Sequence, residues 1–255
     1  MTIRRNFFKD IYRNQAEQFD RLVAREDRRG NLFAALNEIR PLRGAKVVEF
    51  GAGTGRLTRL LSVAVEGIFA FDIEASMLGC AQSAMRATGM TNWHLSLGDN
   101  GRMPVASACA DLAIEGWSFA HVREWHPEAW RAQTDAMLAE MARVLKPGGT
   151  AILIETMGAG GRQPLASTNL RQLYDHWEQE HGLSYRWIRT DYQFASPQEA
   201  DELIRFFFGD DLANTCLDGK RVIVPECTGI WWKHLECTRL KIRMGPAEKS
   251  SAQES

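Results

Sequence analysis

Three glycines stand at alternate positions in VVEFGAGTGRLT, residues 47–58. Gly51, Gly53 and Gly55 follow a short apolar run and precede a helical pattern. A glycine turn from strand to helix lets a ligand approach the backbone closely. In an open α/β sheet, such a ligand lies beyond the carboxyl ends of the strands, where the strand order reverses. The stretch therefore predicts a ligand site, with a glycine turn that binds nothing as the alternative.

The spacing of these glycines bears on the kind of ligand. The dinucleotide fingerprint is GxGxxG, followed about 20 residues later by an acid for the ribose. Asp72 supplies such an acid, but Arg56 stands where the third glycine belongs. The spacing here is GxGxG, with Glu49 two residues before the first glycine. These departures count against a nicotinamide cofactor and leave it as the second interpretation.

The elements around the turn alternate between strand and helix patterns. The predicted strands are residues 46–50, 68–71, 93–97, 111–115 and 150–156. Helical patterns at 57–64, 76–88 and 128–145 separate several of them. Such alternation predicts right-handed crossovers and a parallel sheet covered on both faces. Two later strand patterns, 221–224 and 228–234, suggest an antiparallel hairpin at the sheet edge.

Five motifs occur in order along the chain. They are VVEFGAGTGR at the first strand, FDIEASML at the second, GD at 98–99, DLAIEGWS at the fourth and LKPGG before the fifth. This set resembles the class I S-adenosylmethionine-dependent methyltransferases. The resemblance is closest to the small-molecule branch that includes the ubiquinone and menaquinone methyltransferases, and it covers roughly residues 10–156.

The resemblance implies a Rossmann-like, doubly wound α/β fold. We expect a mostly parallel seven-stranded sheet that is completed by the antiparallel C-terminal hairpin. The expected parts are an N-terminal helical lid (1–43), an S-adenosylmethionine-binding core (44–156), a helical and aromatic insert (157–210), the hairpin segment (211–240) and a disordered tail (241–255).

The resemblance also implies S-adenosylmethionine as the cofactor, which has no phosphate for a loop to hold. The backbone from Gly51 through Ala52 and Gly53 to Gly55 would approach its amino-acid end. Asp72 would accept both ribose hydroxyls, with capping of the following helix as the alternative.

Further cofactor contacts are expected around these residues. Asp99 with Asn100 would accept from the adenine amino group, unless they only form a turn. Ile73 and Met77 would sandwich the adenine, unless both belong to the core. Glu49 would fix the glycine loop or lie near the cofactor's ammonium group.

Tyr12 lies in IYRNQAEQFD, which is similar to the YxxxAxxYD-like lid stretch of the small-molecule branch. Phe19 replaces the second tyrosine of that pattern, so a hydroxyl contact is lost there.

The methyl acceptor is expected to lie near EGWSFAHV, residues 115–122, because acceptor specificity in this family usually lies just after the fourth strand. Methyl transfer is a direct displacement, so the enzyme aligns the reactants and excludes water, and it needs a base only if the acceptor loses a proton. Trp117 is the candidate acceptor contact, with packing as the alternative, and His121 is the candidate general base. The stretch lacks the Pro-Pro-aromatic pattern of enzymes that methylate DNA bases.

The composition of the chain limits the kinds of molecule that we expect it to bind. The net charge is −1 and no long basic run occurs, so we expect a small-molecule acceptor and no nucleic acid. No apolar stretch is long enough to span a bilayer, and the N-terminus lacks the apolar region of a secretory signal. The five cysteines form no CxxC pair, which predicts free thiols in a reducing cytoplasm. The oligomeric state is not indicated.

No metal site is predicted. The six histidines form no HExxH motif. His121 and His126 are five residues apart, as are His176 and His181. Five residues of an α-helix correspond to about 500° of rotation, so each pair should diverge.

Three classes of function therefore compete. The first is methyl transfer from S-adenosylmethionine to a small molecule by direct displacement, with protein methylation left open. The second is a nicotinamide-dependent oxidoreductase. The third is a methyltransferase-like fold that binds a cofactor or partner without catalysis.

Overall fold

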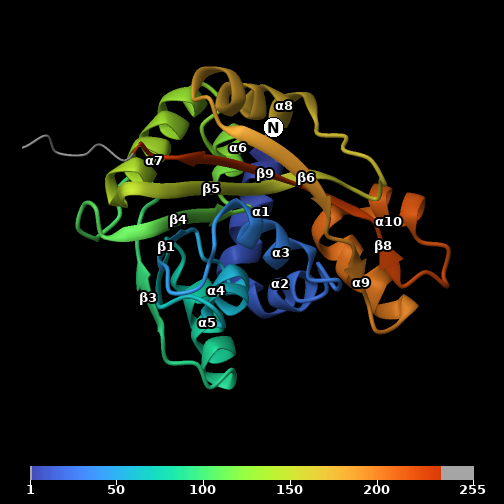
Figure 1. Ribbon diagram of the computed structural model, residues 1–255. Coiled ribbons are helices and arrows are strands. Elements are labelled where there is room, and N and C mark those ends of the chain that lie inside the picture. The colour runs from blue at the N-terminus through green and yellow to red at the C-terminus, as the bar shows by residue number, and fades with distance from the viewer. Residues whose placement is uncertain (1, 237–255) are drawn as a thin grey trace, which may run out of the picture.

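A seven-stranded sheet forms the centre of the computed structural model, which describes residues 2–236 (Figure 1). The strand order is β3-β2-β1-β4-β5-β9-β6. Because the order reverses between β1 and β4, the carboxyl ends of these two strands form the switch point where ligands bind in such sheets. The strands are β1 (Lys46–Phe50), β2 (Gly67–Asp72), β3 (Trp93–Leu97), β4 (Ala110–Gly116), β5 (Leu145–Ala159), β6 (Ser184–Arg189) and β9 (Glu226–His234). The predicted doubly wound, mostly parallel sheet is confirmed.

Helices cover both faces of this sheet (Figure 1). One apolar core lies between the sheet and α3 and α4, and the other lies between the sheet and α7 and α8. No helix within residues 2–236 is long and apolar enough to cross a membrane. The helices are α1 (Thr2–Asn14), α2 (Ala16–Val23), α3 (Asn31–Ile39), α4 (Arg56–Ser62), α5 (Ala75–Ala87), α6 (Val122–Trp125), α7 (Trp130–Val144), α8 (Thr168–Asp175), α9 (Pro197–Phe208) and α10 (Asp210–Cys216), with a 3₁₀ turn η1 (Phe119–His121) and a π-helical turn η2 (His176–Glu180).

The antiparallel edge of the sheet differs from the predicted hairpin. β9 runs antiparallel to β5, but its other neighbour is β6, which comes from within the predicted insert. The segment predicted as the first hairpin strand contributes β8 (Ile223–Val224), which pairs with β7 (Tyr192–Gln193) in a separate two-stranded sheet. Only Pro225 separates β8 from β9, whereas even the tightest common hairpin needs a two-residue loop. The hairpin prediction is therefore wrong, and β9 alone runs against the other strands of the main sheet.

The N-terminal helices pack against a helix from the far end of the chain. Leu22 of α2 shares an apolar cluster with Leu203 and Ile204 of α9. The rings of Phe8 and Phe19 each lie 5.4 Å from the ring of Phe207. Ser196 caps α9, since its hydroxyl accepts the backbone N–H of Glu199 at 3.1 Å. The N-terminal helices and α9 thus form one layer, shown in blue and orange in Figure 1.

The predicted divergence of His176 and His181 is wrong. The η2 turn is π-helical, and the N–H of His181 donates to the carbonyl of His176, five residues back. This wider turn aligns residues five apart, so the two Nε2 atoms lie 3.2 Å apart.

Two further expectations concern the cysteines and the tail. Four cysteines are free thiols, as predicted: Cys80, Cys109, Cys216 and Cys227. The fifth cysteine and the predicted disordered tail lie outside the described residues.

Candidate active site

The glycine turn between β1 and α4 has the backbone conformation that its three glycines predict. Gly51, Gly53 and Gly55 have φ values of +66°, +55° and +80°, a region that side chains rarely allow. A Cβ atom at Gly51 would collide with the side chain of Ser118, and one at Gly55 would lie 3.1 Å from Cβ of Ala81. Both conformation and packing therefore require glycine, and the turn presents bare backbone at the switch point of the sheet.

Asp72 joins this turn to the next helix. It is the last residue of β2, and its carboxylate accepts the N–H of Gly53 at 2.8 Å and the N–H of Glu74 at 2.8 Å. Burial is the largest influence on this carboxyl group and raises its pKa. Glu74 precedes α5, so Asp72 does take part in capping that helix, the alternative noted from the sequence. The carboxylate thus lies between the glycine turn and α5, at the carboxyl end of the sheet.

Glu49 is buried beneath α4. Its side chain accepts the hydroxyl proton of Thr58 at 2.6 Å, so it holds the helix that follows the glycine loop. Burial raises the pKa of Glu49 to about 8, and the charge of Asp72 contributes in the same direction.

The expected adenine contacts are only partly brought together. Met77 is buried beside Gly53, whereas the side chain of Ile73 is 62% exposed. Asp99 accepts the N–H of Gly101 at 2.7 Å and is used in a turn, the alternative noted from the sequence. Asn100 donates to the hydroxyl of Ser118 at 2.9 Å, so it reaches the loop that packs on Gly51.

Trp117 has an unusual backbone and a cationic neighbour. Its φ of +54° lies in the left-handed region, which is uncommon for a bulky residue and is often found at functional sites. The guanidinium of Arg56 lies 3.6 Å from the centre of its ring and is also paired with Glu26 at 2.7 Å. Arg56, which replaces the third glycine of the dinucleotide pattern, therefore packs on the residue expected to contact the acceptor.

Tyr12 and His121 meet beneath the N-terminal helices. The Tyr12 hydroxyl lies 2.8 Å from Nε2 of His121, whose ring stacks on Trp125 at 4.5 Å. Burial lowers the pKa of His121 to about 4, so its imidazole is neutral at pH 7, and the tautomer decides whether Nε2 or the Tyr12 hydroxyl donates in this hydrogen bond. Burial also raises the pKa of Tyr12. Sequence reasoning singled out both residues but did not predict their contact.

Polar contacts hold α1 and α2 against α4 and the start of α5. Asp20 pairs with Arg59 of α4 at 2.8 Å, and Arg13 pairs with Glu74 at 3.1 Å. The hydroxyl of Ser76 donates to the carbonyl of Tyr12 at 2.6 Å.

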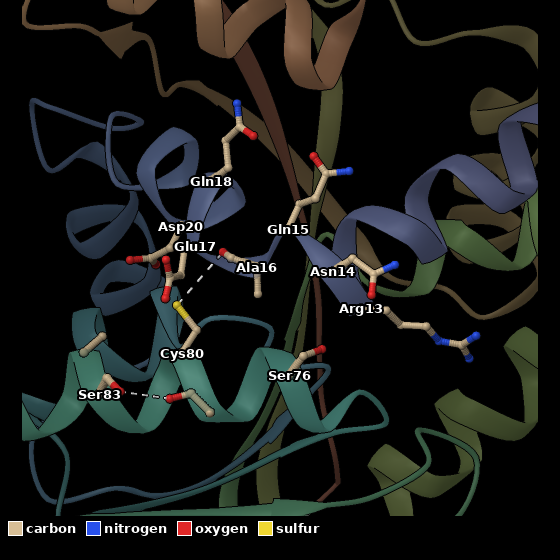
Figure 2. Close-up of a pocket in the computed structure, with 12 residues that line it drawn as sticks. Arg13, Asn14, Gln15, Ala16, Glu17, Gln18, Asp20, Ser76, Cys80 and Ser83 are labelled. Atoms are coloured by element: carbon tan, nitrogen blue, oxygen red, sulfur yellow. Dashed lines mark hydrogen bonds between the residues drawn. The ribbon is translucent and has the colours of Figure 1, made fainter.

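A hollow of about 740 Å³ lies at the junction of these helices with α5 (Figure 2). Its lining comes from residues 13–20 and from the outer side of α5, including Ser76, Cys80 and Ser83. The hollow therefore lies between α1 and α2 on one side and α5 on the other, and its lining does not include the glycine turn.

Two buried acids were missed by sequence reasoning. Glu115, near the end of β4, accepts the N–H groups of Ser118 and Phe119 at 3.1 and 3.3 Å. Glu155 of β5 accepts the N–H of Ala120 at 2.8 Å. Burial raises the pKa of Glu155 to about 8, and burial together with the charge of Glu155 raises that of Glu115. The available signal was a single acid inside each apolar strand, in LAIEG and ILIET.

Comparison with known proteins shows similarity to methyltransferases over part of the chain. Residues 47–149 match a methyltransferase domain family. The malonyl-[acyl-carrier protein] O-methyltransferase of Serratia marcescens is 25% identical over 181 residues, which are 71% of this chain and 61% of the relative. The ubiquinone/menaquinone biosynthesis C-methyltransferase UbiE of Neisseria meningitidis is 32% identical over 116 residues, which are 44% of this chain and 43% of the relative. The chain thus spans less than two thirds of either relative.

Solved structures agree on the fold. A SAM dependent methyltransferase from Aquifex aeolicus has a TM-score of 0.51 at 14% identity, over 81% of this chain and 93% of that one. The [4+2]-cyclase SpnF has a TM-score of 0.52 at 20% identity, over 81% of this chain and 80% of that one. Such identities show the fold alone. The family match supports S-adenosylmethionine rather than a nicotinamide as the cofactor. The glycine turn and Asp72, at the switch point of the sheet, both lie within residues 47–149, the part of this chain that is similar to the methyltransferase domain family.

Proposed function

We propose that this protein transfers the methyl group of S-adenosylmethionine to a small-molecule acceptor by direct displacement. The observation that carries the proposal is the contact between Asp72 and the glycine turn. In the proposal, this carboxylate binds the ribose hydroxyls, and the bare backbone beside it holds the amino-acid end of the cofactor. The family match to residues 47–149 supports the same assignment.

The residues around this contact have separate roles in the proposal. The backbone from Gly51 to Gly55 lies along the amino-acid end of the cofactor, and Asp72 binds the ribose. The exposed Ile73 covers one face of the adenine, and Asn100 is at its edge. Asp99 is a weaker candidate, because its carboxylate already accepts a backbone N–H in its own turn.

A small, apolar and flat acceptor fits the surroundings of His121 best. The rings of Phe8, Tyr12 and Trp125 lie within 5.4 Å of the His121 ring centre. Of the two relatives, the one named for C-methylation in ubiquinone/menaquinone biosynthesis supports such an acceptor, whereas the other is named for O-methylation of malonyl-[acyl-carrier protein]. The net charge of −1 argues against nucleic acid, and the free thiols support a reducing cytoplasm.

His121 is the general base in this proposal when the acceptor must lose a proton. The proposal requires the tautomer with a lone pair on Nε2, and it requires the 2.8 Å contact of this atom with the Tyr12 hydroxyl to open before the acceptor's proton is taken. Replacing His121 with Ala should lower kcat about 10²-fold or more with such an acceptor, and leave cofactor affinity within about threefold. His126→Ala, a change of an exposed histidine five residues on, is the control. A kcat within threefold of wild type would remove His121 from the catalytic role.

Thermal melting with four cofactors tests the proposal directly. S-adenosylmethionine and S-adenosylhomocysteine at about 100 times their dissociation constants should raise the Tm by roughly 5–10 °C. NAD and NADP at the same concentrations should not. A shift with the nicotinamides alone would overturn the proposal, and a shift with none of the four would favour the non-catalytic alternative.

A further inference from the structure

Three metal-ligating side chains converge on the outer side of α7, outside the candidate active site. Oδ1 of Asp135 lies 2.7 Å from Nε2 of His176 and 2.7 Å from Nε2 of His181. The two Nε2 atoms are 3.2 Å apart. The π-helical turn η2 creates this arrangement, because it aligns two histidines that an ordinary α-helix would separate.

Hydrogen bonding alone explains this triangle poorly. If both rings are neutral and donate to Oδ1 of Asp135, their two N–H groups point to the same oxygen. The two donor nitrogens are then at van der Waals distance from each other. A cation at that place satisfies all three atoms at once. Tetrahedral Zn²⁺ with bonds of about 2.0–2.1 Å separates its ligand atoms by about 3.3 Å. The two distances from Asp135, each 2.7 Å, need to widen by about 0.6 Å, and the distance of 3.2 Å between the histidines by about 0.1 Å.

We propose that Asp135, His176 and His181 bind one divalent transition-metal ion, with Zn²⁺ as the ion to test first. Two imidazoles and one carboxylate form a donor set typical of zinc. The Asp135 side chain is 48% exposed and that of His181 30% exposed, so the ion can enter from solvent and keep a water as its fourth ligand. His176 is only 7% exposed and packs edge-on against Trp130, which fixes one ligand before the ion binds.

The role of this ion is structural. Asp135 belongs to α7, which covers the sheet, while both histidines flank the η2 turn that follows α8. The ion would therefore link the segment that precedes β6 to α7. The carbonyl of His181 already accepts from Lys233 at 2.6 Å, so the backbone of this ligand is anchored on the β9 side as well.

Arg131 competes with the ion. Its guanidinium donates to Nδ1 of His176 at 3.1 Å, which leaves the ring proton on Nε2. A metal on Nε2 requires the neutral ring to carry its proton on Nδ1 instead, so Arg131 must turn away. The residue is exposed and can do so, but its donor and its positive charge oppose metal binding. Arg131→Gln should therefore bind zinc several-fold more tightly than wild type.

The test is a zinc titration of the full chain, stripped with a chelator and studied without S-adenosylmethionine. A chromophoric chelator gives affinity and stoichiometry, and a thermal melt gives stability. Wild type should bind one equivalent, and saturating zinc should raise its Tm by about 5–10 °C. His181→Ala and Asp135→Asn should each weaken binding at least tenfold. The control His126→Ala removes an exposed histidine elsewhere and should bind as wild type does.

Two outcomes overturn the proposal. Either wild type takes up no more zinc than His181→Ala and Asp135→Asn, or His126→Ala loses as much affinity as they do. The first would assign the cluster to hydrogen bonding alone, and the second would assign the zinc to scattered surface histidines. Since neither readout involves the cofactor, the result is independent of the methyltransferase activity.

Discussion

Glu155 and Glu115 place two carboxyl groups inside the carboxyl-terminal end of the sheet, where they hold the loop after β4. Burial raises the pKa of Glu155 to about 8, against about 4.3 in an unfolded chain. The folded state therefore keeps a proton that the unfolded state loses. The contribution of Glu155 to stability is complete below about pH 4.3 and is lost as the pH rises through 8.

Glu155→Gln removes this titration and keeps an oxygen for the N–H of Ala120. We expect the variant to be more stable than wild type by roughly 1–3 kcal/mol at pH 8.5 and close to wild type at pH 5. Urea unfolding at both pH values measures the difference, and Glu128→Gln, at an exposed site, is the control. If the variant and wild type differ in unfolding free energy by the same amount at both pH values, then the pKa of Glu155 is not raised by burial.

Asp72 has two roles that a single substitution confounds, because its carboxylate holds the glycine turn as well as the proposed ribose site. Asp72→Ala should weaken S-adenosylhomocysteine binding by roughly 1.5–3 kcal/mol, the scale of lost charged hydrogen bonds. Calorimetry with the 2′-deoxy form of this ligand separates the roles. If Asp72 binds the ribose, removing the 2′-hydroxyl should cost wild type affinity and cost the variant much less. Equal losses in both proteins would leave Asp72 with the structural role only.

At the scale of elements, α1, α2 and α9 pack together beside the proposed cofactor site, and we expect α2 to move when the cofactor enters. The Asp20–Arg59 pair is partly buried and joins α2 to α4 directly. Asp20→Asn should speed both binding and release of S-adenosylhomocysteine about 3–10-fold in stopped-flow measurements, with little change in Kd. Asp201→Asn breaks the Arg205 pair within α9 and should leave both rates unchanged. Unchanged rates in Asp20→Asn would show that α2 does not limit entry.

The elements also show where sequence reasoning works. The strands at 46–50 and 93–97 were predicted to the residue, because each is a five-residue segment between turn signals, a length that suits a strand and is too short for a typical helix. The strand pairing at the C-terminal edge was wrong, since β6 and β9 are separated by over thirty residues and local patterns carry no information about partners. Similarly, Tyr12 and His121 are 109 residues apart in the sequence, so their hydrogen bond depends on packing that no motif encodes.

At the scale of the whole molecule, the late segments complete the core that the first half of the chain begins. β9 lies between β5 and β6, and its Trp231 ring is 4.4 Å from that of Tyr174 and 5.2 Å from that of Trp177. The hydroxyl of Tyr174 donates to the carbonyl of Thr156 on β5 at 2.7 Å. One apolar cluster therefore runs from Val48 of β1 to Trp231 of β9.

Such a shared core predicts a single cooperative unfolding transition. Tryptophan fluorescence includes the signal of the fully buried Trp177 and Trp231, whereas far-ultraviolet circular dichroism reports all helices and strands. The two urea curves should have the same midpoint and the same slope. Trp231→Phe, which leaves a cavity and removes the bond to Glu178, should move both midpoints together to lower urea. Two separate transitions, or a shift in the fluorescence curve alone, would mean that residues 160–236 form a unit that unfolds apart from the cofactor-binding core.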